Sequence, residues 1–534
     1  MSNRAIAYAN RAQEAPEIIA KELSACHIIP RLVRQGTDNQ GMTFNDPLKF
    51  LAVCLAACLA TSAFTQVHAQ NQAQSQAQNL PPEVEAALAR AKVPREALAV
   101  MVIDAAPAAQ GRAAPLLSFR ANASVNPASV MKLVTTYAGL ELLGPAYTWA
   151  TPVFVDGTVK DGVLTGNLII QGRGDPKLVM ERLWLLLRRV QGLGIKTITG
   201  DILLDRSAFA VAALSPADFD GEPLRPYNAS PDALLLNFKS VVMTFVPNYA
   251  SGVVNVNFDP PLANVQMQTS VPLNSNKDCG DYRNILAADF SDPFRMAFKG
   301  SYPVGCGEKV WPIAYADPAS YSERAVAGMW VELGGKLGGR VRDGRVPPGL
   351  RSTIEVSSPS LAEVIRDINK FSNNVMAQQL FLTLGMKSGQ GNSPASFEAS
   401  RAVVQSWWRE RFGEQDMPVL DNGSGLSRQE RITPQGMARM LQAAYLSGAM
   451  PELMSSLPIT GIDGTLRNTK SRVSQGWAHL KTGSLRDSTA LAGYVHTPSG
   501  RRLVVVAVVN HLNAPAARPA LEALVDWAVK EGGK

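Results

Sequence analysis

Apolar residues recur with helical spacing near both ends of this chain and with strand-like spacing in much of its middle. Residues 83–92, for example, place Val84, Ala87 and Leu88 on one face of a helix. The pattern predicts further helices at residues 129–143, 177–191, 361–370, 374–384, 396–412, 434–446 and 519–530. It predicts strands at residues 99–103, 151–156, 164–171, 195–204 (a pair of short strands), 234–257, 329–333, 491–495 and 503–510.

This order of elements predicts an α+β fold. The runs at residues 491–495 and 503–510 are apolar and β-branched, as buried strands of a sheet are. Helices flank these strands and also the first strand at residues 99–103, whereas residues 151–353 are rich in short strands. We therefore expect one domain, an antiparallel sheet with helices, to be assembled from both ends of the chain around a large strand-rich insertion.

Length and composition predict a large core and a mildly charged surface. The 534 residues are 46% hydrophobic, which is enough for about two to four domains. The net charge of +7 is typical of ordinary solubility charge and would also help an approach to an anionic polymer such as a bacterial wall. No dense Lys/Arg block or nucleic-acid-binding motif is present, so nucleic acid is not an expected partner.

A short apolar run at residues 50–64 follows Lys49 and leads to a small-residue exit that ends at Ala69. These features are typical of a secretory signal peptide, and the run is short for a transmembrane helix. We expect a signal peptide at residues 42–69, with cleavage after Ala69 and export to the periplasm. The alternative is a lipoprotein-type cleavage that leaves a lipid anchor on Cys58.

The segments on either side of this signal differ from it. Residues 1–41 fit no export signal and are interpreted as an extension of the gene model, so that residues 1–69 together form a leader. Residues 70–79 are uncharged and of low complexity, which predicts a flexible tether.

Two of the five cysteines, Cys279 and Cys306, lie beyond the leader. An even pair in an exported protein predicts a disulfide that closes one loop of the insertion. Two separate buried thiols are the alternative. A zinc site is not expected, because no second Cys or His pair stands nearby at ligand spacing.

Three short segments carry the candidate chemistry, in the order S-x-x-K, S-x-N and K-T-G. Each alone has an ordinary reading: a helix start with a solvated lysine, a helix cap, and a turn. Together and in this order they are typical of serine enzymes that acylate on D-alanyl-D-alanine peptides or on β-lactams. The segments are Ser129 to Lys132, Ser372 to Asn374, and Lys481 to Gly483 followed by Ser484.

The first two segments supply a nucleophile, a base and a relay. A serine hydroxyl is a poor nucleophile until a base removes its proton. Lys132 shares a helix face with Ser129, and desolvation or a neighbouring charge such as Lys481 would lower its pKa enough for that task. The Ser372 hydroxyl is a candidate proton relay to the leaving amine, and the Asn374 amide is a candidate to hold a substrate peptide group or to orient Lys132.

The third segment is expected to open an edge strand of the sheet. Gly483 lets a substrate backbone approach and pair as an added strand. Lys481, together with the hydroxyls of Thr482 and Ser484, is the candidate carboxylate-binding set. The backbone N–H groups of Ser129 and Ser484 are the expected oxyanion pair.

These motifs resemble the low-molecular-mass class C penicillin-binding proteins, the D-alanyl-D-alanine carboxypeptidase/endopeptidase family (peptidase family S13). Residues 421–428 (D-N-G-S-G-L-S-R) resemble the family's G-S-G-L-S-R segment, and residues 457–466 (L-P-I-T-G-I-D-G-T-L) resemble its L-P-x-x-G-x-D-G-[TS]-L segment. Residues 174–176 and 200–202 resemble stretches of its insertion. One departure is Asn373, where the family commonly has Asp, which leaves the structural role of that side chain open.

The resemblance covers nearly the whole expected mature chain and implies a three-domain protein. A split serine β-lactamase/transpeptidase-like catalytic domain would comprise residues 80–150 and 354–534. Domain II would comprise residues 151–173 and 253–353, and domain III would be nested within it at residues 174–252.

The implied function is that of a periplasmic serine DD-carboxypeptidase/DD-endopeptidase that uses a Ser129 acyl-enzyme and no metal or other cofactor. Its expected partners are peptidoglycan stem peptides, with β-lactams as covalent inhibitors; peripheral membrane association and the oligomeric state stay open. A serine β-lactamase is disfavoured because no E-x-x-L-N segment follows Ser372. A non-catalytic wall-binding scaffold is disfavoured because every catalytic group is present. A histidine-based triad is disfavoured because no G-x-S-x-G elbow surrounds Ser424.

Overall fold

The computed structural model describes residues 79–106, 114–212, 215–388 and 393–531, all of which belong to one unit spanning Ala73–Lys534. The expected leader at residues 1–69 and all but the last residue of the expected tether lie outside the described residues. In the described part of the chain, no helix combines the length and apolarity that a membrane span requires.

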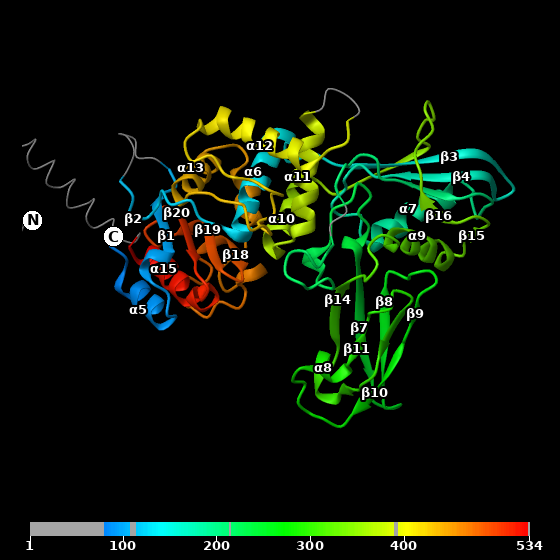
Figure 1. Cartoon of the computed structure of the whole chain (residues 1–534), viewed down its shortest axis with the longest axis horizontal. Helices are drawn as coiled ribbons and strands as arrows, with labels where there is room; N and C mark the ends of the chain where they lie inside the picture. The colour runs from blue at the N-terminus through cyan, green and yellow to red at the C-terminus, as the bar shows by residue number, and fades with distance from the viewer. Residues whose placement is uncertain (1–78, 107–113, 213–214, 389–392, 532–534) are drawn as a thin grey trace, which may run out of the picture. The chain divides into compact units, whose positions relative to one another are not determined.

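The first sheet is assembled from both ends of the chain, as predicted. Its strands lie in the order β18-β19-β20-β1-β2, and every neighbouring pair is antiparallel. Figure 1 shows β1 and β2 beside β19 and β20, which come from the opposite end of the sequence. The bounds are β1 Leu98–Asp104, β2 Leu117–Phe119, β18 Ala478–Leu485, β19 Ser488–His496 and β20 Arg502–Asn510.

Helices bury both faces of this sheet. Alternate residues of a strand point to opposite faces, so Val504 and Val506 of β20 join the core formed with α6 and α13. Val505 and Ala507 join the core formed with α5 and α15. Burial on both sides explains the continuous apolar run in the sequence. The bounds are α5 Pro82–Arg90, α6 Lys132–Leu143, α13 Pro434–Tyr445 and α15 Arg518–Glu531.

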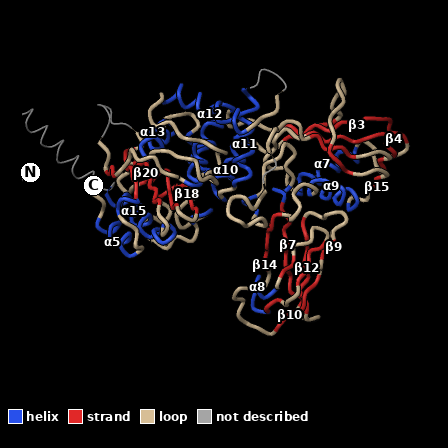
Figure 2. Tube along the Cα trace, viewed as in Figure 1, coloured by secondary structure: helices blue, strands red, loops and turns tan. Residues whose placement is uncertain are grey.

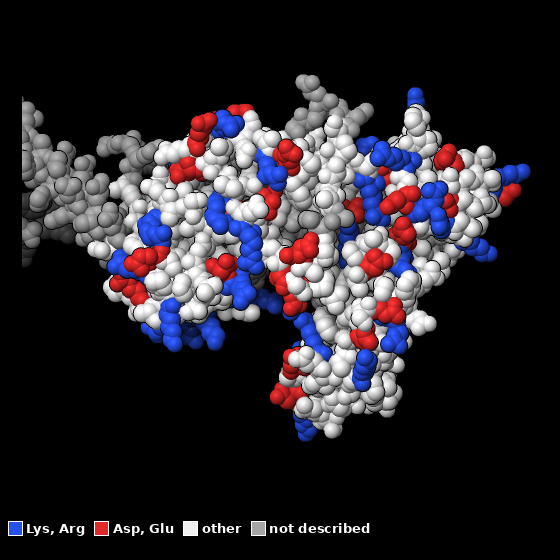
Figure 3. Space-filling model, in the orientation of Figure 1, with Lys and Arg blue, Asp and Glu red and all other residues white. Residues whose placement is uncertain are grey.

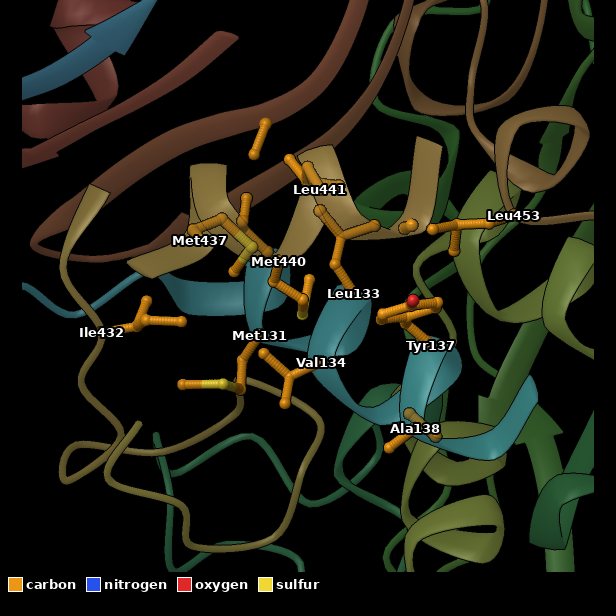
Figure 4. Packing of buried hydrophobic residues seen from close by; sticks show 14 of the residues in the cluster. Met131, Leu133, Val134, Tyr137, Ala138, Ile432, Met437, Met440, Leu441 and Leu453 are labelled. Atoms are coloured by element: carbon orange, nitrogen blue, oxygen red, sulfur yellow. The ribbon is translucent and has the colours of Figure 1, made fainter. Parts of the chain in front are cut away.

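Helix α6 is apolar on nearly every side and lies deep in the domain that contains the first sheet. Leu133, Val134 and Tyr137 are fully buried in one cluster with Met440 of α13 and with Leu453. Figure 4 shows these side chains around the helix. A helix that is hydrophobic all round is a buried helix, and this burial includes Lys132 at its first position. The other helices of this domain are α10 Leu361–Phe371, α11 Asn374–Ser388, α12 Phe397–Phe412 and α14 Met450–Ser456.

The insertion contains a seven-stranded sheet with two helices, α7 and α9. Its main path runs β15-β5-β4-β3-β17, with β6 and β16 paired beside β4. The bounds are β3 Ala150–Lys160, β4 Val163–Gln171, α7 Met180–Gly192, β5 Thr197–Ile198, β6 Ile202–Asp205, α9 Tyr321–Glu332, β15 Lys336–Leu337, β16 Val341–Asp343 and β17 Ile354–Ser357.

A second group of strands is nested inside the first. Five of them form a sheet in the order β13-β10-β8-β7-β14, and three form the small sheet β11-β12-β9. Figure 2 shows how strands dominate this part, whereas helices dominate around α10 to α13. The bounds are β7 Ser240–Asn248, β8 Val253–Asp259, β9 Gln266–Met267, β10 Ser270–Asn274, α8 Tyr282–Leu286, β11 Ala288–Asp289, β12 Arg295–Phe298, β13 Tyr302–Pro303 and β14 Lys309–Ala314.

This pairing divides the insertion differently from the borders expected at residues 174–252. Strands β5 and β6 were expected in the nested domain, but both run parallel to β4 in the outer sheet. Strand β8 was expected outside the nested domain, but it pairs with β7. A sheet is a unit of hydrogen bonding, and a local apolar pattern does not reveal which distant strand supplies the partner.

Two local predictions were also wrong. Residues 329–333, predicted as a strand, lie at the end of α9, where Met329 and Trp330 face the core. A short apolar run has the same composition in a buried helix and in a strand. Residues 195–204 do contain two short strands, but these do not pair with each other. Residues 234–257, predicted as strand, contain a short 3₁₀ turn followed by β7 and most of β8, which pair as a hairpin. The other predicted helices and strands are confirmed, with ends shifted by a few residues.

The nested strands carry the predicted disulfide. Cys279 and Cys306 are bonded, with an S–S distance of 2.03 Å.

On the molecular face shown in Figure 3, acidic and basic side chains are interspersed. That face therefore shows no extended basic surface of the kind that nucleic acids require.

Candidate active site

Ser129 lies on a single 3₁₀ turn, η2 (Ala128–Met131), which leads directly into α6. The sequence pattern predicted that the helix begins at Ser129. In the structure the regular helix begins at Lys132, and Ser129 lies on the turn before it. Asn126 holds the turn from three sides: its N–H donates to Asn510 Oδ1 (2.8 Å), its Nδ2 donates to Ser427 O (2.9 Å), and its Oδ1 accepts from Ala128 N (2.9 Å). Ala128 has a left-handed backbone (φ 47°), a conformation that persists only where the surroundings enforce it.

Lys132 is fully buried beneath Ser129. Its Nζ lies 2.9 Å from Ser129 Oγ, 2.6 Å from Asn374 Oδ1 and 2.5 Å from the carbonyl oxygen of Ser424. Burial, and then the positive charge of Lys481, holds the pKa of Lys132 well below its usual value, while the charge of Glu430 acts in the opposite direction. Both causes were predicted from the sequence.

These three oxygen contacts satisfy an ammonium group, and they also accommodate the neutral amine that the lowered pKa favours. A neutral lysine has two N–H protons and one lone pair. The oxygens of Asn374 and Ser424 only accept hydrogen bonds, so they take the two protons. The lone pair is then left for the hydroxyl proton of Ser129. In that form, the arrangement could accept the hydroxyl proton of Ser129.

The second motif lies between two helices. Ser372 has a left-handed backbone (φ 58°) at the end of α10, and its Oγ accepts a hydrogen bond from Lys481 Nζ (2.9 Å). Asn374 opens α11 and also donates from Nδ2 to the backbone oxygen of Tyr227 (3.2 Å), which belongs to the insertion. Asn373 accepts from Met376 N (3.0 Å), so an amide in place of the family's usual carboxylate still caps the helix.

The third motif lies on β18, the edge strand of the first sheet, as predicted. It occupies the second half of the strand and does not open it. Lys481 is fully buried, and burial lowers its pKa to about 7. Its Nζ also donates to Thr482 O (2.7 Å). A Cβ added at Gly483 would lie 2.5 Å from Pro127 O and 3.1 Å from Ser129 N, so the strand and the turn that carries Ser129 approach closely here.

The free edge of β18 is covered at one end and open at the other. Pro458 O accepts from Leu480 N (2.9 Å), and Thr460 N donates to Ala478 O (3.0 Å). An isolated antiparallel bridge joins Ile459 to His479 between them. Residues 481–485 continue past this cover, so an extended peptide can pair with the strand beside Ser129.

One cavity of about 290 Å³ brings most of the predicted residues together. Ser129, Ser372 and the third motif from Thr482 onward line it. Behind them, Lys132 contacts Ser129, Lys481 contacts Ser372, and Asn374 contacts Lys132. His479 lies beside His496, with ring centroids 5.2 Å apart. Among the described residues, no cluster of three or more His, Cys, Asp or Glu side chains is arranged to hold a metal ion.

Sequence reasoning assigned no role to Glu430. Its fully buried carboxylate accepts from the backbone N–H groups of Asp421, Asn422 and Gly423 at 3.2, 3.2 and 2.7 Å. It therefore holds the loop whose Ser424 oxygen contacts Lys132. Burial raises the pKa of Glu430 to about 7 against the lowering effect of these N–H groups. The G-S-G-L-S-R resemblance indicated the loop, but a lone glutamate after it gives no local signal.

With this geometry in hand, comparisons with known proteins identify the family. The model of the D-Ala-D-Ala carboxypeptidase 3 (S13) family matches residues 80–531. The chain belongs to this family. The prediction drawn from the motifs is thereby confirmed, as is the α+β fold with its split transpeptidase-like domain and strand-rich insertion.

Individual S13 relatives are distant but cover most of the chain. A D-alanyl-D-alanine carboxypeptidase DacB of Haemophilus influenzae is 26% identical over 390 residues, 72% of this chain and 80% of the relative. A D-alanyl-D-alanine carboxypeptidase of Actinomadura sp. (strain R39) is 25% identical over 405 residues, 72% of this chain and 73% of the relative. The crystal structure of penicillin binding protein 4 from Haemophilus influenzae superposes with a TM-score of 0.65 at 23% identity, covering 84% of this chain and 99% of that one.

Proposed function

We propose that this S13 protein is a serine DD-carboxypeptidase/DD-endopeptidase that cleaves D-Ala-D-Ala termini and D-Ala-diaminopimelate cross-links of peptidoglycan. The observation that carries the proposal is the contact of Lys132 Nζ with Ser129 Oγ at 2.9 Å, made by a fully buried lysine. A desolvated lysine is a base at neutral pH, and an activated serine is the nucleophile that acyl transfer needs.

In the acylation step, Ser129 Oγ forms a bond to the carbonyl carbon of the penultimate D-alanine, and its proton passes to Lys132 Nζ. The backbone N–H groups of Ser129 and Ser484 are proposed to hold the oxyanion. When the C–N bond breaks, the leaving amine takes a proton from Ser372 Oγ, which Lys481 Nζ replaces across 2.9 Å. In deacylation, water adds to the ester carbon and its released proton passes through Ser372 Oγ to Lys481 Nζ, while Lys132 Nζ returns its proton to Ser129 Oγ as the ester C–O bond breaks. Ser129 and both lysines thereby regain their starting forms.

Substrate binding is proposed along the open part of β18. An extended peptide would pair with the backbone of residues 481–485. Gly483 lets the turn of Ser129 lie directly against this part of the strand. The hydroxyls of Thr482 and Ser484, with the charge of Lys481 behind them, suit the carboxylate of the C-terminal D-amino acid. Both proposed substrates carry such a carboxylate next to the scissile amide.

A second cavity is proposed to accommodate the side chain of a branched stem peptide. It has a volume of about 450 Å³ and is lined by residues of the insertion, including Asp218 and Tyr227, and by the loop with Asp421 and Arg428. Side chains of both charges in one cavity suit a zwitterionic side chain such as that of diaminopimelate. β-Lactams are proposed to acylate Ser129, and export to the periplasm is proposed from the signal-like segment at residues 42–69.

The decisive experiment replaces the nucleophile. We expect Ser129→Ala to abolish D-alanine release from a pentapeptide and covalent labelling by a fluorescent penicillin, while the Tm stays unchanged. The surface variant Ser455→Ala is the matched control and should behave as wild type. Persistent labelling of Ser129→Ala would rule out the proposed nucleophile. Digestion of cross-linked muropeptides by the wild type, analysed by chromatography, separates endopeptidase from carboxypeptidase action.

A further inference from the structure

Thr465 lies in the active-site cavity but belongs to none of the three motifs. Its side chain is exposed there, beside Ser372 and Thr482. Its Oγ1 lies 2.7 Å from Oγ1 of Thr482, close enough for a short hydrogen bond between two hydroxyls. Thr482 is the motif residue proposed above to bind the substrate carboxylate.

An ion pair between a buried lysine and a partly exposed aspartate lies beside Thr465. Lys370 Nζ contacts Asp463 Oδ2 at 2.6 Å, and Asp463 Oδ1 accepts from Ile459 N at 2.8 Å. Thr465 follows Asp463 on the short 3₁₀ turn η6 (Gly464–Leu466). Lys370 stands two residues before Ser372 at the end of α10. The end of one helix therefore positions both Ser372 and, through Asp463, Thr465.

The turn itself has little freedom. Gly464 has a left-handed backbone (φ +55°), and a Cβ there would lie 2.6 Å from Lys370 O, so only glycine fits this approach. Leu466 is buried in one cluster with Leu480 of β18. Thr465 is thus held between a glycine that packs on α10 and a leucine that packs beside β18. Such support is expected for a residue that must point in one direction.

The hydroxyl protons give this contact a direction. A threonine hydroxyl has one proton to donate and can also accept. When Thr482 donates its one hydroxyl proton to a substrate carboxylate, it has no proton left for Thr465. The hydrogen bond between the two hydroxyls must then be donated by Thr465. Thr465 is placed to be that donor, and a chain of hydrogen bonds that runs one way strengthens each member.

We propose that Thr465 is a positioning residue for substrate: its hydroxyl donates to Thr482 and thereby orients the Thr482 hydroxyl toward the C-terminal carboxylate of the peptide. This inference rests on the proposed DD-carboxypeptidase function and adds a specificity residue to it. The ion pair of Lys370 with Asp463 keeps Thr465 in register with β18.

The test pairs two variants with two substrates. Thr465→Val keeps the shape and removes the hydroxyl, and Thr465→Ser restores the hydroxyl. For a peptide ending in D-alanyl-D-alanine, we expect Thr465→Val to lower kcat/KM about tenfold, mainly through KM, because the hydrogen bond between the two hydroxyls is lost and the Thr482 hydroxyl is no longer oriented toward the carboxylate. Thr465→Ser should stay within about twofold of wild type. For the same peptide ending in D-alanyl-D-alanine amide, Thr465→Val should match wild type, because no carboxylate is present.

Other outcomes overturn the inference in distinguishable ways. An unchanged kcat/KM of Thr465→Val on the free acid overturns it, and so does an equal loss on acid and amide, which indicates a merely structural role. Acylation by benzylpenicillin and by its methyl ester gives the same comparison in a second chemical series. Failure of the wild type to release D-alanine or to bind penicillin would instead refute the proposed function itself.

Discussion

Gly483→Ala tests whether the distance between β18 and the Ser129 turn sets the reaction rate. Gly483 has an ordinary strand backbone, so the substitution introduces no strain in φ and changes only the available space. The added methyl group would lie 2.5 Å from Pro127 O, 3.1 Å from the Cβ of Ala128 and 3.1 Å from Ser129 N. Two of these neighbours are backbone atoms, which cannot rotate away as a side chain does.

The size of the effect follows from the shift that the methyl group requires. Ordinary contact begins at 3.4 Å, so β18 and Pro127 must move apart by about 0.9 Å. The proposed oxyanion donors, Ser129 N and Ser484 N, lie on opposite sides of this gap. A misplacement of about 1 Å in a catalytic site costs about 10²-fold in rate, which is about 2.7 kcal/mol. We therefore expect kcat/KM for D-alanine release to fall about 100-fold.

The assay compares acylation rates and stability. The second-order rate of labelling by a fluorescent penicillin should fall by the same factor as kcat/KM, because both reactions use one oxyanion site. Gly448→Ala is the matched control: Gly448 has open space around it and an ordinary backbone, so this variant should acylate as wild type does. A Tm scan shows whether both variants fold. Wild-type acylation by a folded Gly483→Ala would refute the reasoning.

Two further predictions concern buried charge. Lys481→Met should abolish acylation yet raise the Tm at pH 7. The pKa of Lys481 is about 7 in the folded chain against 10.5 in a model peptide. Between these pH values the unfolded state binds more protons than the folded state, so the stability of the wild type rises with pH across that window. The Tm difference between Lys481→Met and the wild type should therefore shrink toward pH 10, and a constant difference would contradict this origin. Glu430→Gln removes the charge that raises the pKa of Lys132, so the pKa of Lys132 should fall. The acidic limb of the pH profile of kcat/KM, which rises as Lys132 loses its proton, should then move to lower pH. A move to higher pH would contradict this effect of Glu430 on Lys132.

The chemistry-bearing residues were predictable because short motifs bring them together locally. Ser129 and Lys132 are one helical turn apart, so their contact at 2.9 Å follows from sequence spacing alone. The order of the three motifs then indicated the family and the convergence of the three segments on one site, whereas the contact of Ser372 with Lys481 is a finding of the structure.

The supporting residues were not predictable in the same way. Lys370 and Asp463 are separated by 93 residues and Glu430 stands alone, so neither has a local partner that would reveal its role. The borders of the nested strands failed for a related reason: β5 and β6 are too short to show their partners, which are β4, β15 and β16. Tertiary contacts decide such cases, and a single sequence does not encode them as spacing.

The partial cover over β18 limits where an extended chain can pair with this sheet. A bare strand edge invites any extended chain, including another copy of the same protein, to add to the sheet. Here residues 458–460 shield the beginning of the edge, and only a strip beside Ser129 stays accessible. Strand addition is therefore confined to the segment that lies beside Ser129. The same cover shortens the edge on which a second copy of the chain could add, so it also limits edge-to-edge association.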